Sequence, residues 1–409
     1  MKHVELSLSL LVSVSLLAGF ARPSADGDEE GWPQWRGPHL DGITTEGAWT
    51  PKGKEKSLWE REVGLGYSSV AVAKGRLYTL GFQVEDGVDV VWCLDAKTGE
   101  ELWAHPYPAK IWNQFHEGGT LTTPTIDGDA VYTLNREGAF FCFDAESGEV
   151  RYERQLVKEL KVEPPTWGFS ASPLVLGDEL YVNVGKVLSL DKKTGKTKWT
   201  SKDYGHAYST PVPFEWEGKS TLAVFNGAGL VLIGRKDGKE LAFHEWKTQY
   251  DVNAASPIVV EDALFISSGY NRGGALVAMT DEGLVPVWET RSMKTQMSGG
   301  VLMDGHLYGF DDSVLKCFGL DGEEKWAERG LGKGALLGAP GRLVVMSAKG
   351  ELVVATASPE GYEELSRAKV IDDGGVFWTT PVLVDGLIYG RSNRGTLVCR
   401  DHRTPAPGN

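Results

Sequence analysis

Aromatic and basic side chains are concentrated in the predicted loops of this sequence, where they could bind a ligand. Three loops repeat an Asn-Arg pair, two long loops carry tryptophan, and three aromatic residues stand just before predicted strands. Aromatic rings offer contact area at low entropic cost, and a guanidinium group forms a planar fork for carboxylates. The residues predicted to bind a ligand or partner are Tyr67, Trp112, His116, Arg136, Trp167, Tyr208, Arg272, Trp378 and Arg394.

The Asn-Arg pairs also have a purely structural interpretation. Asparagine tolerates left-handed turn conformations, so Asn135, Asn271 and Asn393 could serve their turns while the neighbouring arginines are solvated. The long loops His105–Gly119 and Leu156–Gly168 are different, because loops of that length are uncommon without a role.

Sequence motifs for catalysis are missing. The eight histidines show neither HxH nor HExxH spacing, and the sequence contains no GxSxG motif. Asp95, Asp144 and Asp191 each precede a predicted turn, where an aspartate side chain accepts hydrogen bonds from backbone amides. The sequence therefore predicts no catalytic residue and no metal site.

Composition narrows the class of protein. The formal net charge of −14 argues against nucleic-acid binding, because neutralising phosphates needs a basic surface. The 51 glycines and 14 tryptophans favour many short strands with tight turns over helices.

A degenerate repeat of roughly 35 to 55 residues organises most of the chain. Each unit reads as four strands: a small-residue and proline segment, a tight turn, two further strands, and a last strand that carries an aromatic residue. Short antiparallel sheets repeated in this way predict an all-β propeller. Units begin at Tyr67, Leu121, Phe169, Ala207, Asn253, Met297, Leu331 and Phe377, which predicts eight four-stranded antiparallel blades.

The eighth unit lacks its last strand. The segment Lys56–Glu62, just before the first unit, contains Trp59 and could supply this strand. We therefore predict that an N-terminal strand closes the last blade, which would remove both free sheet edges.

The segments Cys93–Trp103, Cys142–Tyr152 and Leu188–Trp199 resemble the repeat of pyrroloquinoline-quinone (PQQ) propellers. The likeness extends from Trp32 to Asp401, and Trp32–Pro38 is similar to the start of exported PQQ-like propellers. A related family is the propeller of the outer-membrane barrel assembly machinery. The resemblance implies aromatic residues that dock between blades, namely Trp59, Trp103, Trp199, Trp288 and Trp326, with Tyr152 and Phe243 as substitutes.

The resemblance does not extend to an enzyme site. Quinoprotein dehydrogenases have adjacent cysteines, a calcium ion with carboxylate and amide ligands, and an aspartate base, and no pattern here matches them. Cys93, Cys142, Cys317 and Cys399 stand at equivalent strand positions in different blades, too far apart to form disulfides. We expect free thiols and no cofactor, with PQQ and calcium as the alternative.

The N-terminus reads as a secretory signal. Lys2 is followed by the apolar run Leu6–Phe20, with small residues suited to cleavage after Ala21 or Ala25; retention as an anchor is the alternative. No cysteine is placed for lipidation, and no other segment is apolar enough to span a membrane. The predicted organisation is a signal peptide at 1–21, an acidic linker and extension at 22–56, the propeller at 57–401 and a disordered tail at 402–409.

These observations support three functions. The first is an exported, non-catalytic scaffold of the periplasm or cell envelope that binds envelope proteins. The second is a diverged PQQ-dependent dehydrogenase. The third is a propeller that binds an extracytoplasmic peptide, glycan or anionic small ligand.

Overall fold

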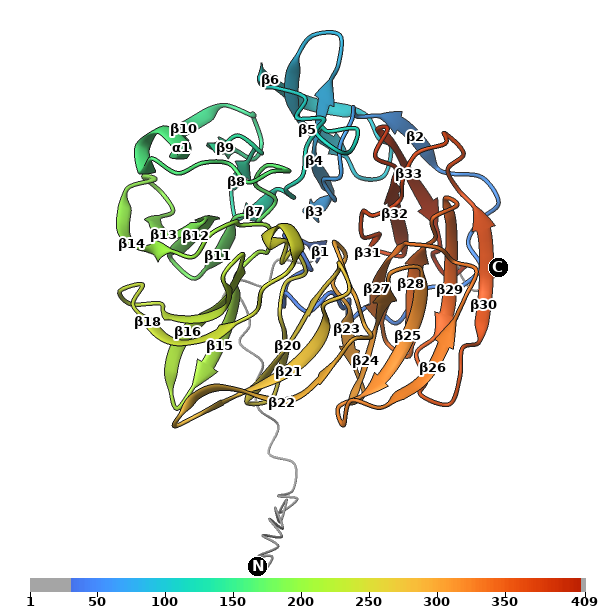
Figure 1. The fold of residues 1–409 in the computed structure, drawn as a ribbon. Coiled ribbons are helices and arrows are strands. Elements are labelled where there is room, and N and C mark those ends of the chain that lie inside the picture. The colour runs from blue at the N-terminus through green and yellow to red at the C-terminus, as the bar shows by residue number, and fades with distance from the viewer. Residues whose placement is uncertain (1–30, 406–409) are drawn as a thin grey trace, which may run out of the picture.

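The structure is a computed structural model that describes residues 31–405. These residues form eight antiparallel sheets arranged in a ring, the blades of a β-propeller (Figure 1). The predicted all-β, eight-bladed fold is confirmed. The predicted signal peptide lies outside the described residues, as do residues 22–30 and 406–409.

The strands follow the chain from blade to blade. Blade one contains β3 (Ala71–Ala73), β4 (Arg76–Gln83), β5 (Val88–Asp95) and β6 (Glu101–Pro108), with β1 (Gly31–Trp32) beside β3. Blade two contains β7 (Thr125–Asp127), β8 (Ala130–Leu134), β9 (Ala139–Asp144) and β10 (Val150–Gln155), followed by helix α1 (Leu156–Leu160). Blade three contains β11 (Leu174–Leu176), β12 (Glu179–Val184), β13 (Lys186–Asp191) and β14 (Thr197–Asp203). Blade four contains β15 (Val212–Trp216), β16 (Lys219–Asn226), β17 (Gly229–Gly234) and β18 (Glu240–Glu245), followed by a 3₁₀ turn at Gln249–Asp251.

The remaining blades complete the ring. Blade five contains β19 (Ile258–Val260), β20 (Ala263–Ser268), β21 (Gly273–Thr280) and β22 (Gly283–Thr290). Blade six contains β23 (Val301–Met303), β24 (His306–Asp311), β25 (Val314–Gly319) and β26 (Glu324–Glu328). Blade seven contains β27 (Ala335–Ala339), β28 (Arg342–Met346), β29 (Glu351–Thr356) and β30 (Glu364–Lys369). Blade eight contains β31 (Val382–Val384), β32 (Leu387–Arg391), β33 (Thr396–Asp401) and β2 (Trp59–Glu62).

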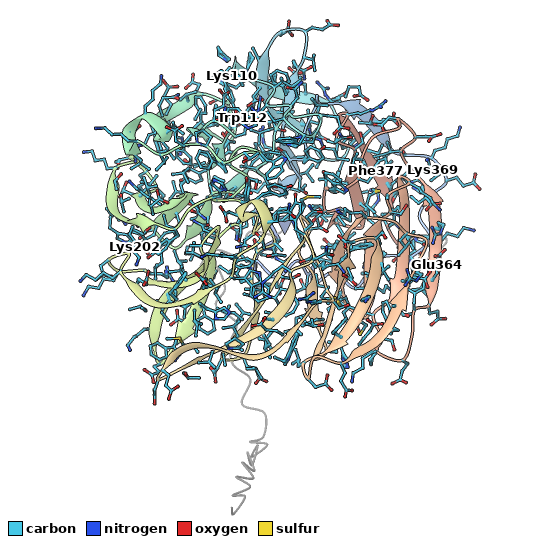
Figure 2. All side chains as sticks on the ribbon, in the orientation of Figure 1. Lys110, Trp112, Lys202, Glu364, Lys369 and Phe377 are labelled. Atoms are coloured by element: carbon cyan, nitrogen blue, oxygen red, sulfur yellow. The ribbon has the colours of Figure 1, made fainter. Side chains whose placement is uncertain are left out.

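The core of the molecule lies between adjacent blades. The inner three strands of each blade are largely buried, as in β9, whereas the outermost strands alternate between exposed and half-buried positions, as in β10. Charged side chains such as Lys202, Glu364 and Lys369 extend from the outer edge of the ring (Figure 2). Because the strands are occupied by packing between blades, residues that bind a ligand or partner are expected in the loops at the two ends of the ring.

An N-terminal strand closes the ring, as predicted. Strand β2 pairs antiparallel with β33, so that Trp59 lies opposite Cys399, and the two strands lie side by side in Figure 1. The closing joint is reinforced by Arg391 at the end of β32, which is buried and donates hydrogen bonds to the carbonyl oxygens of Ser68 and Leu80 in blade one. The two ends of the propeller are thus joined both by a sheet and by a side chain.

The five predicted docking tryptophans lie between blades and share one contact. Each indole Nε1 donates a hydrogen bond to a backbone carbonyl in the turn between the third and fourth strands of the next blade. In blade one, Trp103 Nε1 lies 3.1 Å from the carbonyl oxygen of Ala145, and the hydroxyl of Tyr78 donates to the same oxygen. The other pairs are Trp59 with Ala96, Trp199 with Arg235, Trp288 with Leu320 and Trp326 with Ser358.

The two predicted substitutes differ from each other. Tyr152 donates from its hydroxyl to the carbonyl oxygen of Lys192, in the same manner as the tryptophans. Phe243 does not dock in this way and is 43% exposed. The corresponding turn of blade five is a two-residue hairpin between Thr280 and Gly283, which is too short to cover the Phe243 ring.

A glycine in the docking turn is required for this contact. Gly148 has a φ of +74°, and a Cβ atom there would lie 2.6 Å from the Trp103 ring. We expect Gly148→Ala to lower the free energy of unfolding by about 1–3 kcal/mol more than Gly177→Ala, because overpacking is added to backbone strain. Gly177 is a matched control, with a φ of +61° and nothing within 4 Å of its added Cβ. Urea unfolding measures both, and equal losses would show that the ring contact is unimportant.

The four cysteines are buried free thiols, as expected, and all lie in the described part of the chain. Each occupies one cross-strand row between a tyrosine and an aromatic docking residue, as Cys93 does between Tyr78 and Trp103. Burial raises the pKa of Cys142 and Cys317 to about 11 and that of Cys399 to about 12.

These thiols are expected to resist modification and to make the fold sensitive to alkali. An unfolded thiol loses its proton near pH 8.5, whereas the folded thiols hold theirs to a pH of about 11. The folded state therefore binds more protons above about pH 8.5, and stability falls as pH rises through that range. We expect a thiol-disulfide reagent such as Ellman's reagent to label no cysteine at pH 8 until urea unfolds the chain. Rapid labelling of the native protein would contradict this expectation.

The segment before β2 differs from the predicted linker. It crosses the ring at the end opposite the loops that join one blade to the next, and it packs on several blades. Trp32 is buried beside β3, and Arg36 donates to the carbonyl oxygen of Gly300 in blade six. Ile43 pairs with Gly338 in blade seven, and the Glu46 carboxylate accepts from a turn of blade eight. The sequence shows no strand periodicity here, because the segment is held by side-chain and isolated backbone contacts.

The structure also differs from the prediction at the start of the tail, at residues 402 and 403. His402 is 3% exposed, and its ring lies edge-on to Trp49 in the N-terminal segment. Arg403 forms an ion pair with Asp401 at 2.8 Å. His402 therefore belongs to the packed body of the propeller, and the exposed Arg403 is held against it by this ion pair.

Candidate functional site

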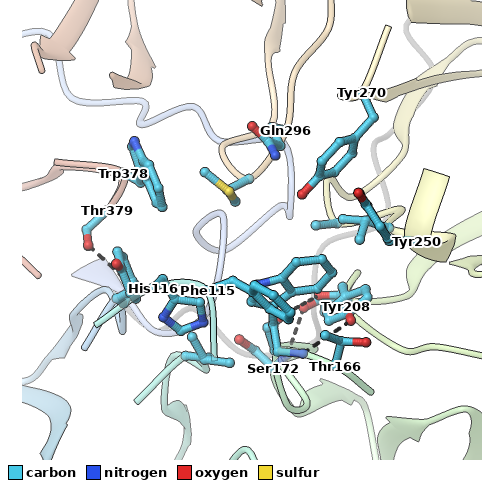
Figure 3. Close-up of a pocket in the computed structure, with 18 of the residues that line it drawn as sticks. Phe115, His116, Thr166, Ser172, Tyr208, Tyr250, Tyr270, Gln296, Trp378 and Thr379 are labelled. Carbon is cyan, nitrogen blue, oxygen red and sulfur yellow. Dashed lines mark hydrogen bonds between the residues drawn. The ribbon is translucent and has the colours of Figure 1, made fainter. Parts of the chain in front are cut away.

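A cavity of about 660 Å³ opens at the end of the ring where the loops between blades gather (Figure 3). We call it the mouth cavity. Much of its wall comes from one repeated position, four residues before the innermost strand of a blade. Seven blades place this residue in the wall: Tyr67, Leu121, Ser170, Tyr208, Ala254, Met297 and Trp378. Blade seven differs: Lys333, two residues before its innermost strand, borders a smaller adjoining hollow.

One side of the mouth cavity is a stack of aromatic rings. Tyr67 and Trp378 are stacked, with centroids 5.4 Å apart and planes inclined by 16°. The ring of His116 meets Tyr67 edge-on at 5.6 Å. Burial lowers the pKa of His116, and its Nδ1 accepts a hydrogen bond from the backbone N–H of Gly118, so the imidazole is uncharged at neutral pH. The Tyr67 hydroxyl donates to the exposed carboxylate of Glu117 at 2.9 Å, outside the lining.

A second aromatic group faces the first across the cavity (Figure 3). Trp167 is its centre and lies within about 6 Å, centroid to centroid, of Phe115, Tyr208 and Tyr250. Tyr270 extends the group by an edge-on contact with Tyr250 at 5.5 Å. Four of these residues come from different connections between blades, and Tyr270 comes from the loop between β20 and β21 within blade five.

The N-terminal segment supplies the floor. Trp35 lines the cavity, and its indole Nε1 donates to the hydroxyl of Ser256 at 3.3 Å. The adjacent Arg36 is buried and fixed to backbone carbonyls, which holds the tryptophan in place. The mouth cavity is therefore a pocket with an aromatic floor.

Hydroxyl side chains line the wall below the aromatic rings. Backbone N–H groups donate from blade to blade into them: Thr123 to Ser172 Oγ and Ser172 to Thr210 Oγ1, each at 2.9 Å. Since these oxygens accept from the protein, their own O–H groups are available to donate into the cavity. Thr166 adds a further hydroxyl and Gln296 an amide. The hydroxyls of Ser170 and Thr379 donate to the backbone carbonyl oxygens of Tyr208 and Tyr67 and offer the cavity only their acceptor lone pairs.

Charged groups stay out of the lining. Among residues 31–405, no Asp, Glu, Lys or Arg side chain lines the mouth cavity. Lys333 lies beside it, bonded to Gln296 and 6.0 Å from the centre of the Trp378 ring. The site thus combines aromatic faces with neutral donors and acceptors.

The predicted arginines do not converge on this site. Arg136 is fully buried, and its Nη1 donates to both carboxylate oxygens of Asp89, at 2.7 and 2.9 Å. Arg272 covers the ring of Trp246 at 3.3 Å and pairs with Glu289. Arg394 donates to the carbonyl oxygen of Asp373. Each guanidinium has an intramolecular partner that the sequence could not indicate, so the expected arginine-rich mouth is wrong.

The predicted aromatic residues lie mostly in the lining. Tyr67, His116, Trp167, Tyr208 and Trp378 all line the mouth cavity. Trp112 stands behind it and joins two loops, because its Nε1 donates to the carbonyl oxygen of Thr166 at 3.0 Å.

Sequence reasoning missed several lining residues. Trp35 lay in the presumed linker, and Tyr250, Tyr270 and Gln296 carry no motif of their own. The repeated position four residues before each inner strand was the signal that could have identified Leu121, Ser170, Ala254 and Met297 as well.

Within 31–405, no three His, Cys, Asp or Glu side chains are grouped as metal ligands would be. No helix in this range has the length and apolar character needed to cross a membrane.

Comparison with known proteins gives related folds. The structure resembles BamB from Moraxella catarrhalis, with a TM-score of 0.61 and 15% identity over 85% of this chain and 99% of that one. It also resembles quinohemoprotein alcohol dehydrogenase from Comamonas testosteroni, with a TM-score of 0.64 and 12% identity over 96% of this chain and 83% of that one. At such low sequence identities, the structural similarity shows a shared fold and nothing further.

Sequence comparison points to the same group. Over 110 residues the chain is 31% identical to the quinoprotein alcohol dehydrogenase PedH of Pseudomonas putida. This match covers 27% of the chain and spans only 17% of the length of that enzyme. The family described as outer membrane protein assembly factor BamB matches residues 89–328, more than half of the chain. The chain therefore belongs to this family of PQQ-like β-propellers.

Proposed function

We propose that this protein is a non-catalytic binding propeller of the bacterial envelope, and that the mouth cavity is its ligand site. The observation that carries the proposal is the cavity itself, about 660 Å³ in volume and walled by aromatic rings with an aromatic floor. Pockets of this size and composition are typical of small-molecule sites. The location rests on the apolar N-terminal run and on the envelope role named in the family description.

The expected ligand is uncharged. A buried charge needs a partner of opposite sign, and the described lining offers no Asp, Glu, Lys or Arg. This corrects the choice of partner suggested by the sequence, since the arginines that favoured an anionic ligand are engaged elsewhere.

The lining does not fit the cofactor named in the quinoprotein relatives. PQQ is a tricarboxylic acid, and its calcium ion needs carboxylate or amide oxygens around it. The mouth cavity offers Gln296 as its amide and no cationic side chain for the carboxylates. We therefore propose that the chain works without PQQ, and that it is not a dehydrogenase.

Native mass spectrometry tests the proposal. Protein incubated with the low-molecular-weight fraction of an envelope extract is expected to retain a bound small molecule. Trp378→Ala and Trp167→Ala should lose it, whereas Trp216→Ala should keep it, because Trp216 lies in a hairpin at the other end of the ring. Retention in all variants, or calorimetric binding of PQQ with calcium, would overturn the proposal.

A further inference from the structure

We infer that the mouth cavity receives the end of a neutral oligosaccharide chain. This inference rests on the proposed function and names its ligand class. The lining combines two kinds of surface that few ligands match together: broad aromatic faces and a set of neutral hydroxyl groups. A sugar ring has apolar C–H faces and a belt of hydroxyls that both donate and accept, so it complements both surfaces.

The hydroxyls of the wall argue against a purely apolar occupant. Ser172 and Thr210 are held by backbone N–H groups with their O–H groups left for donation. Tyr208 also accepts from a backbone N–H, that of Trp167, at 3.5 Å. An aromatic or aliphatic group pressed against these residues would leave several donors without a partner, which is unfavourable in a buried site. Sugar hydroxyls would accept from them.

The described lining has no charged side chain, and this favours neutral sugars over acidic ones. Acidic sugars carry carboxylates or sulfates, which proteins bind with arginine or lysine. Lys333 borders the adjoining hollow, where it is bonded to Gln296 and lies 3.9 Å from Asp312. The described lining therefore favours neutral sugar units.

The rim indicates that the ligand extends beyond the cavity. Phe115 lines the cavity yet is 83% exposed, and Tyr250 is 55% exposed. Both have left-handed backbone conformations, with φ values of 69° and 68°. Such conformations are unfavourable for bulky residues, so each loop holds its ring in place against a local cost. The two exposed rings are placed to stack on a second sugar unit outside the cavity.

The floor sets the direction of entry. Trp35 and the N-terminal segment close the inner end, so a polymer cannot pass through the ring. A chain can enter only by an end, with its terminal unit between Trp378 and Trp167 and the next unit at Phe115 and Tyr250. A cyclic oligosaccharide has no end to insert.

Calorimetry with defined sugars tests the inference. The probes are the neutral trisaccharides cellotriose, xylotriose, mannotriose, maltotriose and N-acetylated chitotriose, the acidic trigalacturonic acid, and γ-cyclodextrin as a cyclic counterpart of maltotriose. At least one neutral trisaccharide is expected to bind, and the acidic and cyclic probes are expected not to bind. Trp167→Ala should abolish binding.

A rim variant separates the two sugar positions. Phe115→Ala is expected to lower the affinity for the trisaccharide by about fivefold to tenfold while leaving the affinity for the corresponding monosaccharide unchanged. Phe243→Ala is the control, since Phe243 is a half-exposed aromatic residue on outer strand β18. Equal weakening by both variants would overturn the rim position.

The outcomes distinguish the inference from the proposed function. If the envelope ligand is retained through Trp378 and Trp167 but proves to be a peptide or an aromatic compound, the inference is wrong and the proposed function stands. If no neutral trisaccharide binds, or if only trigalacturonic acid binds, the inference is also overturned. If no substitution in the mouth cavity changes the binding of any ligand, both the inference and the proposed function are wrong.

Discussion

Replacing Asp89 by alanine is expected to lower the free energy of unfolding by about 3–5 kcal/mol, because it leaves the buried guanidinium of Arg136 without its counter-ion. Both side chains are fully buried, and the carboxylate holds the guanidinium through two hydrogen bonds. Burial by itself raises the pKa of Asp89, and the charge of Arg136 opposes that rise. The pair is therefore stable only as a unit.

This ion pair also positions the mouth cavity. Arg136 donates to the carbonyl oxygen of Lys110 in the loop that carries Phe115 and His116. Its own carbonyl oxygen accepts from Phe169, at the end of the loop that carries Trp167. Loss of the pair should loosen both loops, which limited proteolysis would detect as faster cleavage between residues 109 and 119.

Urea unfolding and two further variants check the assignment. Asp86→Ala removes an exposed carboxylate from the same hairpin and is expected to change stability by less than about 0.5 kcal/mol. The double variant Asp89→Leu with Arg136→Met should recover most of the loss, because apolar groups can replace a buried ion pair. A double variant as unstable as Asp89→Ala would argue against an electrostatic cause.

Arg391→Met is expected to cost about 3 kcal/mol and to open the ring at its closing joint. The guanidinium donates to the carbonyl oxygens of Gly64, Ser68 and Leu80, at 2.7–2.9 Å. Methionine keeps much of the volume but removes the donor from these acceptors, of which the Leu80 carbonyl oxygen still accepts from the Thr120 hydroxyl. Each buried group left unpaired costs about 1–3 kcal/mol. Part of this loss is offset, because burial also disfavours the charge and lowers the pKa of Arg391 to about 9.

Hydrogen exchange distinguishes opening of the ring from general destabilisation. Amides of β2 and of residues 63–80 should exchange faster in Arg391→Met while blades three to six stay protected. Arg394→Ala is the matched control, since that arginine is exposed and makes one hydrogen bond to a backbone carbonyl of Asp373. Uniformly faster exchange over all blades would contradict a local opening.

The sequence was sufficient for the fold because the propeller is built from short-range patterns. Each hairpin, docking turn and outer aromatic residue lies within one repeat, and repetition makes each signal visible several times. The closing strand could be predicted by counting, since one blade lacked a strand and the segment around Trp59 had no blade.

The site was less predictable because its contacts join distant parts of the chain. Arg136 and Asp89 are 47 residues apart, and Trp35 and Ser256 are 221 apart. No local pattern distinguishes a buried arginine from one that faces a ligand, so three arginines were placed at the mouth in error. The prediction that Phe243 docks between blades was wrong for a related reason, since docking depends on the length of a turn in the next blade.

The repeated wall position has a consequence for how such a site can change. Seven of the eight blades contribute one residue at this position, while the neighbouring hydroxyls and the docking turns maintain the scaffold. Duplication of a repeat supplies a symmetric ring, and divergence at these seven separate codons then makes its centre asymmetric. Ligand selectivity can therefore be altered one substitution at a time without disturbing the packing of the blades. This makes the propeller a natural starting point for laboratory evolution of new binding specificities.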